Sequence, residues 1–299
     1  MTARPERVAA EEVRQRMLDA GRELALEAGA ALTIEHLRLE EVIQRARVPR
    51  SSVYRMWPYR EEYIDELLCY LAGAGSFFSD RTLIDPETFS IAAQVVTDHP
   101  GRLGSTEGRR ALLCEVVRLT CTRNYHELSG SAPWRLHMAL IATLGSTRSG
   151  EARRRIAAAL EDSQRRSRDS IIFVLSHLAT TLGVRVRDPA YTLDHVQLAG
   201  GLLVQALALR NVQVQTALAH PGAGPDGQAA GTVPPGDAGD AGDSPDLTEP
   251  IRVNELLNAP IPGPGLDGEP AQWTLAAFAY LGVIDAFMEL DPDFTPPGT

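Results

Sequence analysis

Residues 37–61 decide the fold of this chain, and they read LRLEEVIQRARVPRSSVYRMWPYRE. Apolar residues recur three or four positions apart over residues 39–46, which predicts a short amphipathic helix. A turn of about three residues then leads into a second short helix over residues 49–56, because Pro49 is tolerated in a first helical turn. The Trp-Pro pair that follows ends this second helix. The pattern predicts a helix-turn-helix whose second helix projects from the molecule.

The polar side chains of the second helix are expected to face outward, because Val48 and Val53 would pack against the first helix. An arginine can donate two hydrogen bonds to O6 and N7 of one guanine, and serine hydroxyls reach bases or phosphates. A tyrosine hydroxyl suits a phosphate contact. The residues predicted to contact DNA are Arg38, Arg47, Arg50, Ser51, Ser52, Tyr54, Arg55 and Arg60. The alternative is a solvated arginine face, with Tyr54 and Trp57 as core aromatics.

This segment resembles the DNA-binding domain of the TetR family of regulators. The family's recognition helix ends in a tyrosine, here Tyr54, and an aromatic residue follows three positions later, here Trp57. A basic–acidic pair then opens the next helix, here Arg60 and Glu61. The likeness covers residues 12–70, and beyond them the chain offers only a compatible helical pattern.

The resemblance implies a homodimeric, ligand-responsive repressor that binds a double-stranded DNA operator. A cytoplasmic location is expected from the cysteines, because three residues without paired spacing favour reduced thiols. It implies phosphate contacts for Tyr54 and Arg60, and base contacts for the outward residues of 49–55. The chain departs from the family at Arg47, where a small residue is usual, and at Pro49, where a serine is usual. These departures concern the groove contacts rather than the expected fold.

The rest of the chain also has a helical pattern, and no segment shows sustained period-two alternation, so strands are not expected. We therefore predict an all-α fold in two domains. Residues 1–73 form a three-helix DNA-binding domain, and residues 74–299 form a larger helical bundle for effector binding and dimerisation. Helices are predicted at residues 11–28, 39–46, 49–56, 60–72, 87–98, 106–128, 132–146, 150–183, 190–218 and 271–290.

Residues 219–270 differ in composition, being rich in Gly, Pro, Ala and Asp, and they are predicted to be a disordered insertion. Residues 222–270 hold nine acids and one arginine, whereas residues 36–60 hold six arginines and two glutamates. The net charge of -10 therefore hides a basic helix-turn-helix. Salt screens the interaction between exposed charges that lie more than about 8–10 Å apart. The local charge balance near DNA therefore decides whether phosphates bind.

A single helix-turn-helix covers one half-site of DNA, so a two-fold dimer is expected. Two apolar stripes at helical spacing are the candidate interface, although either of them could instead be intramolecular core. The predicted dimer residues are Leu198, Leu202, Leu209, Trp273, Tyr280 and Phe287.

An effector pocket is sought where aromatic walls meet a few polar groups, since small-molecule sites have this character. The predicted pocket residues are Tyr125, Trp134, His137, Met138, Phe173 and His177. A single histidine on a helix is also a common core or surface residue, and that alternative stays open.

Enzymatic and metal chemistry find little support in the sequence. All 29 basic residues are arginine, which excludes a P-loop lysine and a lysine nucleophile. The histidines are scattered and the three cysteines lack ligand spacing, so neither a metal nor a cofactor is predicted. Neither a secretory signal nor a membrane-spanning segment is expected, because the first thirty residues are rich in Arg and Glu and no apolar run is long enough. The alternatives to a regulator are a helical adaptor that has lost DNA binding and an all-α enzyme.

Overall fold

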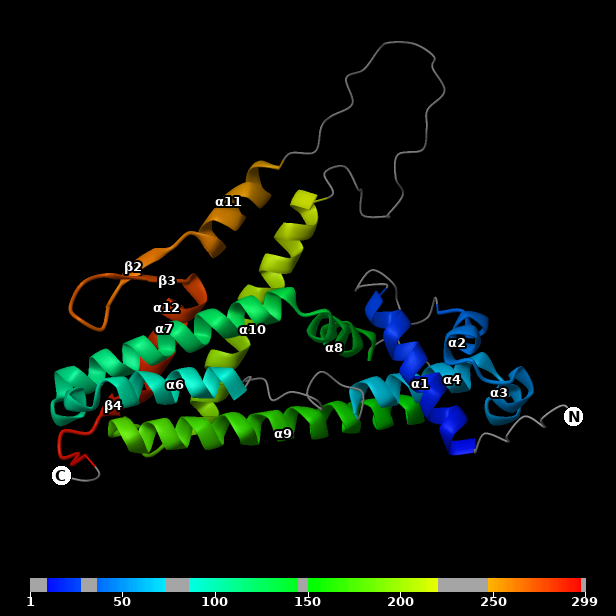
Figure 1. The fold of residues 1–299 in the computed structure, drawn as a ribbon, viewed down its shortest axis with the longest axis horizontal. Coiled ribbons are helices and arrows are strands. Elements are labelled where there is room, and N and C mark those ends of the chain that lie inside the picture. Colours follow the sequence, from blue (N-terminus) through cyan, green and yellow to red (C-terminus); the bar gives the residue numbers. More distant parts are fainter. Residues whose placement is uncertain (1–9, 28–36, 74–85, 145–149, 220–246, 297–299) are drawn as a thin grey trace, which may run out of the picture. The chain divides into compact units, whose positions relative to one another are not determined.

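The computed structural model describes residues 10–27, 37–73, 86–144, 150–219 and 247–296, and these are predominantly helical, as the sequence predicts (Figure 1). The chain divides into two compact units. The first unit comprises Met1–Leu83 and Ser131–Ser170, and the second comprises Ile84–Gly130 and Ile171–Thr299. The predicted domain boundary at residue 73 coincides with the end of a helix, but the first unit also takes in a later part of the chain.

The first unit contains the four helices expected before residue 73, one later helix and part of another. They are α1 (Ala10–Glu27), α2 (Leu39–Ala46), α3 (Arg50–Met56), α4 (Arg60–Ala72), α8 (Ala132–Thr143) and the first part of α9 (Gly150–Leu182). Helix α1 packs against α2, α3 and α4. Their shared core is lined by Met17, Val42, Val53 and Leu67, which are fully buried.

Close packing of α1 on α4 depends on Gly21. A Cβ atom at this position would lie 2.3 Å from the Tyr63 hydroxyl and 2.9 Å from a Leu67 methyl. The Tyr63 hydroxyl donates a hydrogen bond of 3.0 Å to the carbonyl of Met17, within the same contact. Burial raises the pKa of Tyr63, so its hydroxyl stays protonated. Glycine is needed here because the two backbones approach so closely.

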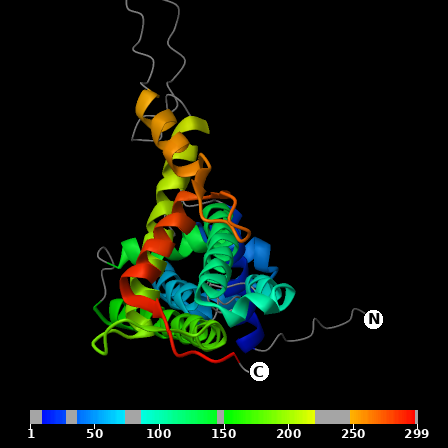
Figure 2. The same cartoon turned by 90° about the vertical axis from the view of Figure 1, so that its left-hand side faces the viewer.

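The second unit is built around three helices that pack on one another, α7, α10 and α12 (Figure 2). Its helices are α6 (Pro86–Asp98), a 3-10 helix (Pro100–Gly104), α7 (Thr106–Gly130), the last part of α9, α10 (Leu193–Ala219), α11 (Thr248–Asn258) and α12 (Leu275–Phe287). Their core includes Val117, Val196, Ala277 and Ile284. The crossing of α10 and α12 is tight at Gly200, where a Cβ atom would lie 2.2 Å from the ring of Tyr280.

Four short strands correct the expectation that the chain has none. Strand β1 (Val184–Val186) pairs antiparallel with β4 (Met288–Leu290), and β2 (Ile261–Gly263) pairs antiparallel with β3 (Ala271–Trp273). Each strand has only three residues, too few for an alternating pattern to be recognised. The helix predicted at residues 271–290 is therefore β3, α12 and β4 in succession.

Helix α11 corrects the prediction that residues 219–270 are one disordered insertion. Residues 220–246 lie outside the described residues, but α11 and β2 occupy the end of the predicted insertion. Leu257 of α11 is buried. The amide of Asn258 donates 3.0 Å to Asn211 of α10 and accepts 3.3 Å from the Tyr125 hydroxyl of α7. These contacts are long-range, so the local composition could not indicate them.

Candidate nucleic-acid interface

Helices α2 and α3 are joined by a turn of three residues, Arg47, Val48 and Pro49. Arg47 has φ 52° and ψ 45°, and its N–H donates to the carbonyl of Gln44, which ends α2. Val48 is buried, and the Pro49 carbonyl accepts hydrogen bonds from the first turn of α3. Val53 is fully buried against α2 and α1. The apolar residues thus fix one face of α3 and leave the opposite face to solvent.

The outward face is basic, as the sequence predicts. Of the residues predicted to contact DNA, Ser52 and Arg60 are half-buried and the other six are exposed. Within the described chain, Arg38, Arg47 and Arg55 form no ion pair and no side-chain hydrogen bond. Three guanidinium groups are therefore exposed to solvent, one at the start of α2, one in the turn and one on α3.

Arg45, the remaining arginine of α2, is bound to α1 instead. Its Nη1 and Nη2 atoms lie 2.7 and 2.8 Å from the two carboxylate oxygens of Glu27. The hydrogen bond from Arg45 holds the pKa of Glu27 below its ordinary value. This exposed pair orients Arg45 away from the outward face.

Glu40 of α2 contacts two of the predicted DNA-binding residues at once. Its Oε1 accepts a 2.7 Å hydrogen bond from the Tyr54 hydroxyl, and its Oε2 pairs with the guanidinium of Arg50. The hydrogen bond to Glu40 raises the pKa of Tyr54. Sequence reasoning did not single out Glu40, because its partners are ten and fourteen residues away and meet it only when α3 crosses α2.

Arg60 has a structural contact that the sequence did not indicate. Its Nε and Nη2 atoms donate hydrogen bonds of 3.2 and 2.9 Å to the carbonyl of Leu37. The bonds join the start of α4 to the residue just before Arg38, the N-cap of α2. Arg60 therefore stabilises the first unit, and its phosphate contact stays a prediction.

The six predicted effector residues are divided between the two units. Trp134, His137 and Met138 lie on α8 in the first unit, whereas Tyr125, Phe173 and His177 lie in the second. Trp134 and His137 are buried, and burial lowers the pKa of His137 to about 4. Phe173 is 76% exposed. Neither unit by itself brings the six side chains together.

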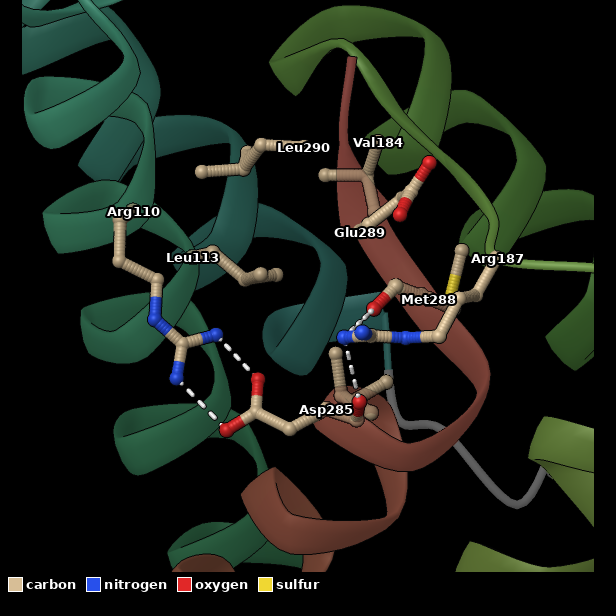
Figure 3. A pocket seen from close by; sticks show the side chains of 9 residues that line it. Arg110, Leu113, Val184, Arg187, Asp285, Met288, Glu289 and Leu290 are labelled. Carbon is tan, nitrogen blue, oxygen red and sulfur yellow. Dashed lines mark hydrogen bonds and ion pairs between the residues drawn. The ribbon is translucent and has the colours of Figure 1, made fainter. Parts of the chain in front are cut away.

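A cavity of about 250 Å³ in the second unit is lined by none of these six residues (Figure 3). Its wall combines apolar and charged side chains from α7, β1 and the segment after it, α12 and β4: Arg110, Leu113, Val184, Arg187, Ile284, Asp285, Met288, Glu289 and Leu290. The guanidinium of Arg110 forms two hydrogen bonds with the Asp285 carboxylate, one of them 2.7 Å long. This pairing raises the pKa of Arg110.

The other charges beside the cavity are also compensated. Nη2 of Arg187 donates 2.9 Å to the carbonyl of Asp285 and 3.3 Å to that of Met288, at the end of α12. The Glu289 carboxylate accepts a 2.9 Å hydrogen bond from Arg185. The arginines therefore fix the end of α12 and the β1–β4 pair, which gives the charged wall a structural role.

The two predicted dimer stripes have different surroundings. Leu198 and Leu202 of α10 are 58% and 56% exposed. Trp273 is buried, and its indole N–H donates 3.0 Å to the carbonyl of Pro264. Tyr280 packs on α10, and Phe287 makes an edge-to-face contact with Tyr191. The second stripe thus packs within the second unit, in line with its alternative interpretation as core, and a dimer contact through it stays a prediction.

Comparisons of the chain with protein-family models, with curated proteins and with solved structures gave no match. Among the described residues, no three His, Cys, Asp or Glu side chains are grouped so as to hold a metal ion. None of the described helices has both the length and the hydropathy needed to cross a bilayer. The basic face of α2 and α3 is therefore the feature from which a function is inferred.

Proposed function

We propose that this chain is a sequence-specific DNA-binding regulator of the TetR type, in which α3 enters the major groove. The observation that carries the proposal is the solvent-facing guanidinium groups of Arg38, Arg47 and Arg55, none of which faces a carboxylate in the described chain. Such groups can neutralise phosphates and donate to guanine. The burial of Val48 and Val53 supports the proposal, because it orients α3 with these groups outward.

The proposed regulator acts as a homodimer, because one recognition helix, here α3, covers only one half-site of DNA. Leu198 and Leu202 lie one turn apart on α10 and are both exposed, so they form an apolar surface that a second copy would cover. Leucine side chains on a solvent-facing helix gain free energy when they are buried in this way. Repression and release by a small-molecule effector are supported by the resemblance of residues 37–61 alone.

The experiment that tests this function is selection of bound duplexes from a random-sequence DNA pool by the full chain. The expected result is enrichment of two related half-sites about 10 base pairs apart, or a multiple of that spacing, as a symmetric dimer requires. Arg55→Gln should weaken enrichment, whereas Arg252→Gln, on the exposed face of α11, should leave it unchanged. If no sequence is enriched even at low salt, the helical adaptor becomes the leading interpretation.

A further inference from the structure

The carboxylate of Glu40 accepts hydrogen bonds from the Tyr54 hydroxyl and from one nitrogen of Arg50, two donors that a DNA phosphate could also use. Tyr54 donates its hydroxyl proton to Oε1 over 2.7 Å, and Arg50 pairs with Oε2. All three residues lie on the solvent side of α2 and α3, with the Arg50 side chain 65% and the Glu40 side chain 44% exposed. The hydroxyl proton of Tyr54 and one amino group of Arg50 are therefore already engaged by Glu40.

A carboxylate and a phosphate group are chemically equivalent toward these donors. Both are anionic and accept hydrogen bonds through paired oxygens, and an arginine fork or a hydroxyl binds either of them. A carboxylate left beside bound DNA would also be repelled by the neighbouring phosphates. A phosphate that binds through the Tyr54 hydroxyl and Nη2 of Arg50 therefore competes with Glu40 for these donors.

On the basis of the proposed function, we infer that Glu40 is an internal substitute for a DNA phosphate, holding Arg50 and Tyr54 in the free protein and weakening binding to DNA of any sequence. The interaction is exposed, so its effect on affinity is modest. An exposed ion pair and one hydrogen bond together correspond to about threefold to tenfold in a binding constant.

Glu41 provides a matched control for the test. It is the next residue of α2, it is exposed and in the same first helical turn, and within the described chain it has no side-chain partner. E40Q and E41Q change the net charge equally and both remove an acid from the start of α2. Only E40Q removes the contact with Arg50 and Tyr54, so a difference between the two variants measures that contact.

The contact itself is tested in the free protein, without DNA. The chain is prepared with 3-fluorotyrosine, and the fluorine resonance that disappears in Tyr54→Phe is followed during a pH titration. E40Q should lower the pKa of Tyr54, because the carboxylate that favours the protonated hydroxyl is gone, and E41Q should not. Equal titrations in the wild type and E40Q would overturn the inference at its first step.

The DNA step is tested by titrating one shuffled duplex at low salt with the wild type, E40Q, E41Q and the double variant E40Q/R50Q. E40Q should bind about threefold to tenfold more tightly than E41Q, and the gain should shrink when Arg50 is replaced. If the wild type binds and E40Q and E41Q are alike, the inference fails and the proposed function stands. If none of the proteins binds, the proposed function fails and the inference fails with it.

Discussion

At the scale of single residues, the turn between α2 and α3 places an unfavourable backbone conformation on Arg47. Its φ of 52° is the only positive value among the non-glycine residues described. A side chain in this conformation costs about 1–2 kcal/mol, and glycine removes that cost while adding some unfolded-state entropy. Arg47→Gly should therefore raise the free energy of unfolding by about 0.5–1 kcal/mol.

The same substitution should weaken DNA binding, because it removes an outward guanidinium group. Urea unfolding and a DNA titration measure the two effects separately. Arg47→Ala is the control, since it removes the charge but keeps the Cβ atom. An alanine variant as stable as the glycine variant would contradict the conformational explanation.

His137 gives the first unit a predicted pH dependence. Its pKa is lowered to about 4 by burial, whereas the unfolded chain titrates near an ordinary histidine value of about 6.5. Between these values the unfolded state binds more protons, so the free energy of unfolding should fall as the pH drops from 6.5 to 4, by up to about 3 kcal/mol. Chemical unfolding at a series of pH values measures the slope.

The variant His137→Phe should flatten this slope, because it removes the buried imidazole. His177→Phe removes a histidine from the exposed surface of α9 and serves as the control. A slope that survives in His137→Phe would assign the pH dependence to other groups.

At the scale of elements, the contact between α1 and α4 is sensitive to a single methyl group. Gly21→Ala places a Cβ atom into Tyr63 and Leu67, and such overpacking costs about 1–3 kcal/mol of unfolding free energy. Gly282→Ala is the matched control, since its Cβ atom would meet nothing within 4 Å and alanine favours the helix. Thermal unfolding of both variants tests this prediction. If Gly21→Ala were as stable as the wild type, α1 and α4 would be able to move apart without a loss of unfolding free energy.

Sequence pattern was enough to predict most of the helices, including the short α2 and α3, but not the strands or α11. Helices α7, α9 and α10 have 25, 33 and 27 residues, and Gly, Pro or Ser lies at their boundaries. Strands β1 and β4 are three residues each and meet across about a hundred residues of chain. Helix α11 was hidden by the Gly-rich composition around it, and its position depends on Asn258 reaching α7 and α10.

At the candidate site, too, the sequence predicted local features but not the contacts between helices. The turn, the buried valines and the exposed arginines of residues 37–61 follow from local pattern, and the structure has them as expected. The contact of Glu40 with Tyr54 and the bonds from Arg60 to Leu37 arise only when α3 and α4 pack against α2. The predicted effector residues are divided between the two compact units, which local sequence pattern could not indicate, and their role stays a prediction.

At the scale of the whole molecule, we predict a dimer that depends on α10. Leu202→Glu places a charge on the exposed apolar surface proposed for the second copy, so sedimentation should show a monomer. DNA affinity should fall with it, because the two half-sites are no longer bound together. Leu256→Glu, at an equally exposed leucine of α11, should remain dimeric. If Leu202→Glu were still a dimer, the dimer interface would have to lie on another surface.

The basic charge on the outward face of α2 and α3 should make DNA binding depend steeply on salt concentration. The measurement is the slope of log affinity against log salt concentration for the wild type, Arg55→Gln and Arg252→Gln on one duplex. Each phosphate contact contributes about 0.9 to this slope. We predict a steep slope for the wild type, reduced by about one in Arg55→Gln and unchanged in Arg252→Gln. Equal slopes for all three proteins would contradict the claim that this face binds DNA.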